Sequence, residues 1–118
     1  MQKNILVTGG AGYIGSHTCL ALIEKGFNVK VMDNFCNSSP KSLEAVSDIA
    51  KNAPGKLVDV INGDIRSQSD TRKAVENVDG VIHFAGLKSV AESNSNPLQY
   101  WDINVNGSIN LLKEFIFI

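Results

Sequence analysis

The sequence lacks the features that many secreted, membrane-bound and nucleic-acid-binding proteins carry. Its 118 residues include only two cysteines, and no apolar run approaches the length that spans a bilayer. The formal net charge is −1, so there is no basic excess of the kind that binds nucleic acid or anionic lipid. The first residues run straight into a strand-like segment, so we expect no signal peptide. These absences favour a cytoplasmic protein without nucleic-acid or membrane partners.

Cysteine and metal chemistry are also poorly represented. Cys19 and Cys36 lie far apart, without CxxC spacing and without a histidine at ligand spacing, so we expect neither a disulfide framework nor a metal site. We interpret Cys19 as a small buried side chain and Cys36 as a loop thiol. The remaining composition, 43% hydrophobic and 19% charged, is typical of one globular domain with a buried core.

Short apolar segments alternate with segments whose apolar residues recur at helical spacing. The apolar segments predict strands at 3–7, 28–32, 57–61 and 80–85. Helices are predicted at 13–25, after Ser39-Pro40, after a cap at Ser67, and after Asn96-Pro97. The order βαβαβαβα indicates an α/β protein with a parallel sheet, helices on both faces and strands buried on both sides.

The last predicted helix and the residues after it determine how far the sheet extends. Apolar residues recur there at steps of three and four: Leu98, Trp101, Val105, Ile109, Leu112 and Phe115. We expect Trp101 to pack in the core. The segment 115–118 is either the beginning of a fifth strand or a helix end. In both cases the strand at 80–85 is predicted to be an exposed apolar edge that can pair with another chain.

Four glycines fall within residues 9–15, directly after the first predicted strand and before the first predicted helix. The spacing Gly9-x-x-Gly12-x-x-Gly15 permits a tight turn, lets a pyrophosphate approach the backbone and lets the helix pack closely. The helix N-terminus then favours phosphate binding. Asp33 ends the second predicted strand, and a carboxylate there accepts hydrogen bonds from a ribose 2′-OH and repels a 2′-phosphate. The pattern therefore predicts a Rossmann-like, doubly wound fold that binds NAD rather than NADP.

Five stretches carry a resemblance to a known family: 12–18, 33–38, 63–66, 81–93 and 100–107. They resemble the UDP-galactose 4-epimerases (UDP-glucose 4-epimerases) of the extended short-chain dehydrogenase/reductase family. The resemblance covers nearly the whole chain and corresponds to the N-terminal part of that family. Phe-Ala-Gly-Leu-Lys at 84–88 is its most specific part, because related dehydratases and decarboxylases share the glycine loop but usually not this stretch.

The resemblance implies cofactor contacts at matching positions. The NAD pyrophosphate would be held by Gly9, Gly12, Tyr13, Ile14 and Gly15. The adenosine ribose and its surroundings would be held by Asp33, Asn34, Asn37 and Ser38, and the adenine would meet Asp64 and Ile65. The nicotinamide side would be lined by Phe84, Ala85, Gly86 and Lys88, with Asn104 supporting it from the last helix. Arg66 is expected to be a surface charge, and His83 a buried, hydrogen-bonded histidine.

The resemblance also shows which chemistry to look for. The family takes a hydride from sugar C4 onto NAD, turns the 4-keto intermediate and returns the hydride to the other face. It uses a serine and Tyr-x-x-x-Lys. The tyrosines here, Tyr13 and Tyr100, are followed four residues later by His17 and Asn104. We therefore predict no catalytic residue in this chain.

On this reading, residues 1–118 are a partial NAD-binding Rossmann domain, without the C-terminal domain that binds the UDP-sugar. The chain alone is expected to bind NAD without turnover. Two alternatives remain: a non-catalytic dinucleotide-binding module, and a fragment of a related nucleotide-sugar dehydratase or decarboxylase. The last helix takes part in a dimer interface in the family, so the chain could form a homo-oligomer through that helix or through the exposed sheet edge.

Overall fold

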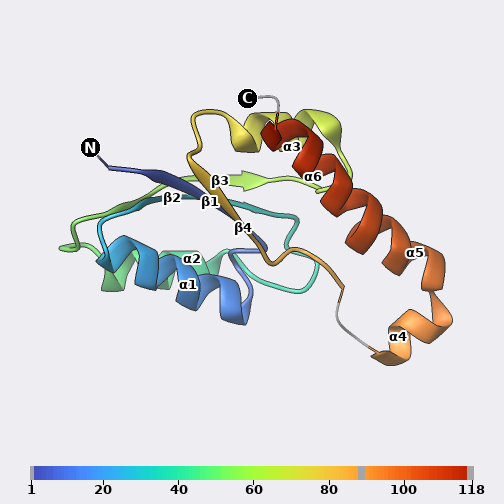
Figure 1. Ribbon diagram of the computed structural model, residues 1–118. Coiled ribbons are helices and arrows are strands. Elements are labelled where there is room, and N and C mark those ends of the chain that lie inside the picture. Colours follow the sequence, from blue (N-terminus) through green and yellow to red (C-terminus); the bar gives the residue numbers. More distant parts are fainter. Residues whose placement is uncertain (1, 88–89, 117–118) are drawn as a thin grey trace.

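A four-stranded parallel sheet forms the centre of the protein. The computed structural model describes residues 2–87 and 90–116. The strands are β1 (Asn4–Thr8), β2 (Asn28–Asp33), β3 (Lys56–Asn62) and β4 (Gly80–His83). Their order is β3-β2-β1-β4, with every neighbouring pair parallel (Figure 1). The predicted α/β fold is therefore confirmed, and β3 and β4 form the two edges of the sheet described here.

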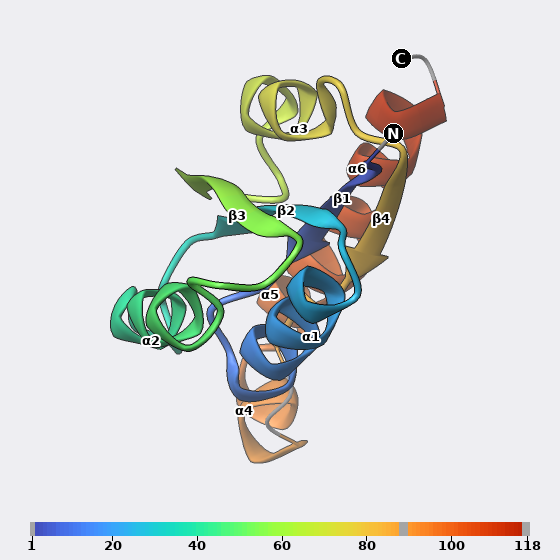
Figure 2. The ribbon, with the colours of Figure 1, turned by 90° about the vertical axis from the view of Figure 1, so that its left-hand side faces the viewer.

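Helices cover the sheet on both faces, as Figure 2 shows. One face carries α1 (Tyr13–Glu24) and α2 (Lys41–Ile49). The other carries α3 (Gln68–Val75) and α6 (Gly107–Ile116). The connection from β4 to α6 contains α4 (Val90–Ser95), α5 (Pro97–Trp101) and the π-helix η1 (Asp102–Asn106). α4 and α5 extend past the carboxyl ends of the strands and away from the sheet (Figure 1).

Alternation along the central strands builds two separate hydrophobic cores. Leu6 and Met32 point into the core under α3 and α6, whereas their neighbours Val7 and Val31 point into the core under α1 and α2. Successive strand residues face opposite sides of a sheet, so a strand that is covered on both faces needs consecutive apolar residues. Each such side chain contributes about 1.5–3 kcal/mol on burial. The sheet therefore holds the glycine loop and the other strand ends on a rigid support.

The strands were predicted to be buried on both faces. This is confirmed for β1 and β2 but is wrong for β3. Val58 and Val60 of β3 are 51% and 41% exposed. The helix layers cover the central strands and leave much of this edge strand open. Cys19 is buried and Cys36 is exposed, as expected. Burial raises the pKa of the Cys19 thiol to about 12, so this thiol stays protonated and inert.

The predicted helix N-termini are confirmed for α3 and α5 but not for α2. Ser67 caps α3, where its side chain accepts a hydrogen bond from Asp70 N, and Pro97 is the first residue of α5, both as predicted. Ser39 was predicted as the cap of α2, but Pro40 occupies that position, and the Ser39 hydroxyl instead accepts a bond from Lys41 N.

The last predicted helix differs most from expectation. It is divided into α5, η1 and α6, and the short helix α4 before it was not foreseen. Trp101, predicted to pack, is 61% exposed because α5 lies beyond the sheet and buries no residue. Phe115 and Ile116 belong to α6, so a fifth strand beginning at these residues is wrong. Phe115 instead packs on the core beside Leu111, one helical turn earlier, and residues 117–118 lie outside the described part.

Candidate functional site

Several glycines shape the loop between β1 and α1, but the fold does not require glycine at each of these positions. Gly9 has φ +69°, and a Cβ there would lie 2.8 Å from Ala85 N. A Cβ on Gly15 would lie 2.2 Å from Gly9 O. Both positions therefore require glycine for packing inside the chain. At Gly12 the nearest atom to an added Cβ is Gly9 O at 3.4 Å, an ordinary contact. The fold alone does not require glycine at position 12.

Gly12 is also the N-cap of α1, in an extended conformation with φ −71° and ψ 176°. The first N–H groups of a helix have no partner within the helix, and glycine has no side chain that could cap them. Tyr13 and Ile14, the first two helical residues, are 81% and 55% exposed. The N-terminus of this twelve-residue helix is therefore open to solvent and favours an anion.

Asp33, the last residue of β2, joins the glycine loop to the loop that follows β2. Its Oδ2 accepts a hydrogen bond from Ala11 N at 3.0 Å. Its Oδ1 accepts bonds from Phe35 N at 2.9 Å and from Ser38 Oγ at 3.2 Å. Asn34 turns the same loop by accepting a bond from Cys36 N. Asn34 and Asn37 are exposed, and Asp33 and Ser38 are partly exposed, so this edge is open to a ligand.

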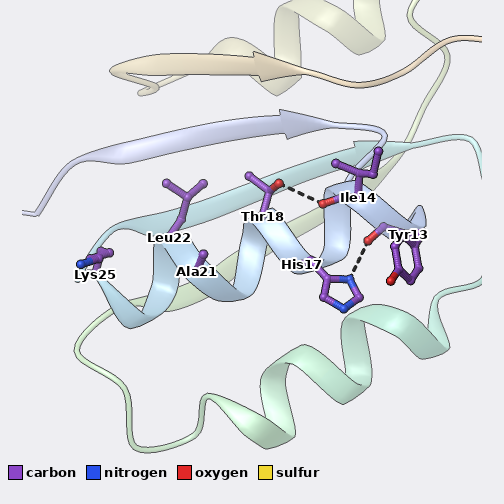
Figure 3. Close-up of a pocket in the computed structure, with 7 residues that line it drawn as sticks. All are labelled: Tyr13, Ile14, His17, Thr18, Ala21, Leu22 and Lys25. Carbon is purple, nitrogen blue, oxygen red and sulfur yellow. Dashed lines mark hydrogen bonds between the residues drawn. The ribbon is translucent and has the colours of Figure 1, made fainter.

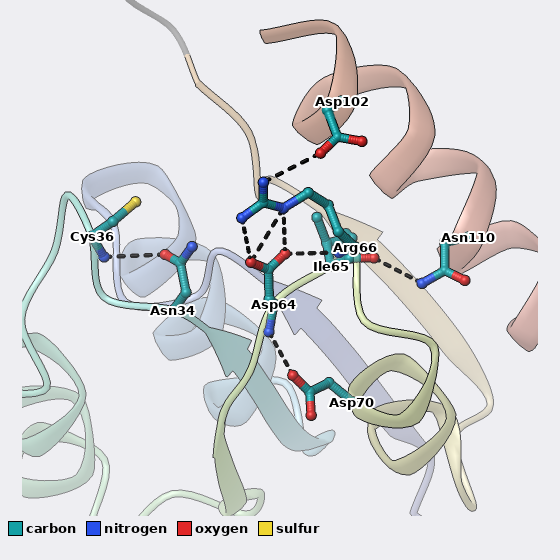
Figure 4. Close-up of polar contacts among 8 residues, drawn as sticks. All are labelled: Asn34, Cys36, Asp64, Ile65, Arg66, Asp70, Asp102 and Asn110. Atoms are coloured by element: carbon teal, nitrogen blue, oxygen red, sulfur yellow. Dashed lines mark hydrogen bonds and ion pairs between the residues drawn. The ribbon is translucent and has the colours of Figure 1, made fainter. Parts of the chain in front are cut away.

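The loop after β3 reaches the same edge of the sheet. Gly63 N donates to Asp33 O at 3.1 Å, which places Asp64 beside the end of β2. The Ile65 side chain points into the core, and its carbonyl accepts a bond from Asn110 Nδ2 of α6 at 2.9 Å (Figure 4). Asp64 remains partly exposed, whereas the Ile65 side chain lies within the protein.

Arg66 connects this loop to the π-helix, a contact that the sequence analysis did not foresee. Its guanidinium lies 2.7 Å from Asp64 Oδ2 and 3.3 Å from Asp102 Oδ2 of η1 (Figure 4). The hydrogen bonds from Arg66 lower the pKa of Asp64, and the same bonds raise the pKa of Arg66. Arg66 is exposed, as expected, but it bridges two segments that are far apart in the sequence.

The segment after β4 is held at both ends. Thr8 accepts two bonds from it: its carbonyl from Phe84 N at 2.9 Å, and its hydroxyl from Ala85 N at 3.2 Å. Asn104 of η1 holds Leu87 twice, because Leu87 N donates to Oδ1 at 2.8 Å and Asn104 Nδ2 donates to Leu87 O at 2.9 Å. Asn104 thus holds this segment from the last helical region.

Gly86 lies where the Asn104 amide crosses the segment. A Cβ on Gly86 would come within 2.9 Å of Asn104 Oδ1, so the close approach of the amide requires glycine. Lys88, the remaining residue predicted on this side, lies outside the described residues.

The loops at the carboxyl ends of all four strands therefore form one continuous surface, joined by hydrogen bonds and packing. Gly9 N donates to Met32 O, Ala11 N to Asp33, and Gly63 N to Asp33 O, while Gly9 packs against Ala85. Ligands of open α/β sheets bind outside the carboxyl ends of the strands, near the helix N-terminus. The structure brings the described part of the predicted set together at that place.

Two hollows lie on the surface of the molecule. One follows the outer face of α1 from Tyr13 to Lys25 and includes only Tyr13 and Ile14 of the predicted set (Figure 3). The other lies between β4 and α6, where Val81, His83, Ser108 and Leu111 line it, so it reaches the end of β4. In residues 2–87 and 90–116 no group of three or more His, Cys, Asp or Glu side chains could hold a metal ion. No helix in the described part is both long and apolar enough to cross a bilayer.

Two polar side chains beside this surface, Thr8 and Ser108, went unrecognised, and His83 was predicted only as a buried, hydrogen-bonded histidine. His83 is hydrogen-bonded, as predicted, but it is exposed rather than buried, because β4 is an edge strand. Thr8 and His83 are register partners in β1 and β4. Both come immediately before the loops of interest, so the parallel pairing of the two strand ends was the signal that could have identified them.

The geometry corresponds to a known family. Residues 5–115 match the model of the NAD dependent epimerase/dehydratase family, and the chain belongs to this family. The chain is 53% identical over 110 residues to UDP-glucose 4-epimerase 3 of Oryza sativa subsp. japonica, covering 92% of this chain and 30% of that protein. It is 42% identical over 123 residues to a UDP-glucose 4-epimerase of Klebsiella pneumoniae, covering 96% of this chain and 86% of that one.

Solved structures agree with these sequence relatives. The UDP-glucose 4-epimerase of Stenotrophomonas maltophila, crystallised with NAD and formylated UDP-arabinopyranose, superposes with a TM-score of 0.88 at 44% identity. The Bifidobacterium longum enzyme, in complex with NAD+ and UDP, gives 0.87 at 43% identity. Each match covers 98% of this chain and 34% of the other. The chain thus spans about a third of the length of these crystallised epimerases.

Proposed function

We propose that residues 1–118 are the NAD-binding part of a UDP-glucose 4-epimerase, and that this chain by itself binds NAD without epimerising a sugar. The observation that carries the proposal is Gly12. It lies at the exposed N-terminus of α1, where the fold would accept a side chain, so the approach of a ligand explains the glycine better than packing does. The similarity to NAD-containing epimerase structures supports the same cofactor.

In this proposal each strand end has a part of the cofactor. Gly9, Gly12 and Gly15 shape the loop around the pyrophosphate, and the N–H groups at Tyr13 and Ile14 donate to it. Asp33 accepts from the adenosine ribose, with Asn34, Asn37 and Ser38 around it, while Asp64 and Ile65 border the adenine. Phe84, Ala85, Gly86, Lys88 and Asn104 form the nicotinamide side. When bound, NAD supplies the hydride acceptor; the residues of this chain bind and orient it.

The catalytic step of a complete enzyme needs groups that this sequence does not contain. A base must remove the C4 hydroxyl proton as the hydride leaves. Neither Tyr13 nor Tyr100 has a lysine four residues later. This observation favours a second candidate, a non-catalytic dinucleotide-binding module, as the description of the chain acting alone. A UDP-sugar would be a ligand only together with the other two thirds of an epimerase chain.

Assembly and location complete the proposal. β4 is an edge strand of the described sheet, and its open side offers a place for pairing with a second copy. We propose a cytoplasmic location, because a buried and an exposed free thiol suit a reducing compartment.

A residue-level titration tests the proposed site. The backbone amide resonances of a labelled chain are followed as NAD is added. We expect the largest shifts at 9–15, 33–38, 64–65 and 84–87. Residues 18–25, along the outer face of α1, serve as the internal control. Shifts confined to these residues would place the ligand elsewhere and contradict the proposal.

A further inference from the structure

The ends of β1 and β4 are joined to α6 by a continuous series of side-chain hydrogen bonds. Thr8 Oγ1 bonds to His83 Nδ1, and the opposite ring nitrogen, Nε2, lies 3.0 Å from Ser108 Oγ. The Ser108 hydroxyl in turn lies 2.6 Å from the backbone carbonyl oxygen of Asn104. We call Thr8, His83, Ser108 and Asn104 the relay. It connects two adjacent strands to the π-helix. Of its residues, only Asn104 is among the NAD contacts proposed above.

The direction of every bond in the relay follows from its partners. A carbonyl only accepts, so Ser108 Oγ–H must donate to Asn104 O. The bond between His83 and Ser108 then needs a proton on Nε2. A neutral ring has one N–H, so Nδ1 carries none and accepts the hydroxyl proton of Thr8. Thr8 Oγ1 keeps a lone pair for Ala85 N. Of the two neutral tautomers, only the Nε2–H form satisfies all four bonds together.

The two ends of the relay hold the two ends of one segment. Thr8 binds Ala85, and Asn104 binds Leu87 through both atoms of its amide. His83 lies between them and immediately before the segment. The ring therefore bonds directly to Thr8 and, through Ser108, to the backbone of Asn104, the two residues that anchor 84–87, which is the nicotinamide side of the proposed cofactor site.

We propose that His83, through Ser108, is a positioning residue that sets the conformation of segment 84–87 for the nicotinamide ring of NAD. This inference rests on the proposed function. Packing of α6 does not depend on the ring, because Gly107 lets the helix lie directly on Ile65, where a Cβ would come within 2.5 Å of Ile65 Cγ2. Replacing His83 or Ser108 should therefore alter the segment without displacing the helix.

Paired titrations with NAD and ADP-ribose test the inference in the full chain. ADP-ribose contains the adenosine, the pyrophosphate and the second ribose but no nicotinamide. In His83→Phe and Ser108→Ala we expect NAD to bind about 3- to 10-fold more weakly, as for the loss of one hydrogen bond, with ADP-ribose within about twofold of the wild type. Ser108→Thr keeps the hydroxyl and should restore NAD binding.

Ser95→Ala is the matched control. Ser95 Oγ also bonds to the carbonyl four residues earlier, that of Ala91, but it lies in α4, outside the relay. This variant should leave the ratio of the two affinities unchanged. If His83→Phe weakens both ligands equally, or leaves NAD binding unchanged, the positioning role is wrong.

An NMR measurement on the ligand-free chain separates this inference from the proposed function. In the wild type we expect the ¹⁵N chemical shifts of the His83 ring to be those of a protonated Nε2 and an unprotonated Nδ1. In Ser108→Ala we expect faster hydrogen exchange of the backbone amides of Ala85 and Leu87. An Nδ1–H ring, or unchanged exchange at both amides, would overturn the relay. If the wild-type chain binds neither NAD nor ADP-ribose, the proposed function fails, while the NMR result still decides whether the relay holds the segment.

Discussion

Gly12→Ala separates what the fold needs from what the ligand needs. An alanine at a helix N-cap costs about 0.5–1 kcal/mol relative to glycine. The backbone at Gly12, with φ −71° and ψ 176°, is allowed for alanine, and the loss of unfolded-chain entropy returns about 0.4–1 kcal/mol. The new methyl would contact only Gly9 O, at 3.4 Å. We therefore expect the free energy of unfolding to change by less than about 0.5 kcal/mol.

Binding of NAD should respond very differently. A methyl group at this position stands where the pyrophosphate must approach the N–H groups of α1. Moving the phosphate away removes about one hydrogen bond to a charged group, which is worth about 1.5–3 kcal/mol. We expect NAD to bind about 10- to 100-fold more weakly, measured by calorimetric titration.

Gly26→Ala is the matched control for this substitution. Gly26 has φ +98°, an added Cβ there would make only ordinary contact with the Pro54 side chain at 3.9 Å, and the residue lies at the other end of α1. Alanine there should cost about 1–2 kcal/mol of stability, because of the left-handed backbone, and leave NAD binding intact. Urea unfolding and titration of both variants should thus give opposite patterns. The reasoning is refuted if Gly12→Ala binds NAD like the wild type, or unfolds as readily as Gly26→Ala.

Three further predictions concern charge and the open sheet edge. Arg66→Gln should move the pKa of Asp64 back towards 3.8, as followed by NMR, and cost less than about 1 kcal/mol because both partners are exposed to solvent; an unchanged pKa would contradict this. Although His83 is exposed at the edge strand, partial burial of its ring lowers its pKa from the usual 6.5. The stability that the neutral ring contributes is therefore complete above pH 6.5 and is lost as the pH falls through the folded-state pKa; a pH profile of stability that is flat in the wild type and sloping in His83→Phe would contradict this. The open edge at β4 predicts light scattering that rises with protein concentration, whereas a clean monomer at high concentration would exclude edge pairing.

Local patterns allowed much of this structure to be predicted. The first strand, the glycine loop and α1 follow from residues that are adjacent in the sequence, and the cap at Ser67 follows from one side chain and its own helix. The site at the strand ends follows from the alternation of strands and helices, because parallel strands end at the same edge of the sheet.

What could not be predicted depends on contacts between distant residues. Helical spacing at Trp101 identifies a face of the helix, but not whether a partner lies opposite it; here the helix extends past the sheet and the indole is exposed. The bond of Arg66 to Asp102 spans 36 positions, and that of Thr8 to His83 spans 75. Neither periodicity nor composition contains such information. Asn104 lies in the π-helix, and its bond to Leu87 likewise joins residues 17 positions apart.

The most direct test is a calorimetric titration of the purified chain with NAD, with NADP as the control, followed in the same sample by an assay for conversion of UDP-galactose. We predict saturable binding of NAD, much weaker binding of NADP because of the Asp33 carboxylate, and no product. Binding of neither nucleotide would contradict the assignment of the strand ends as a cofactor site. Formation of UDP-glucose would show that a residue other than a tyrosine paired with lysine serves as the base.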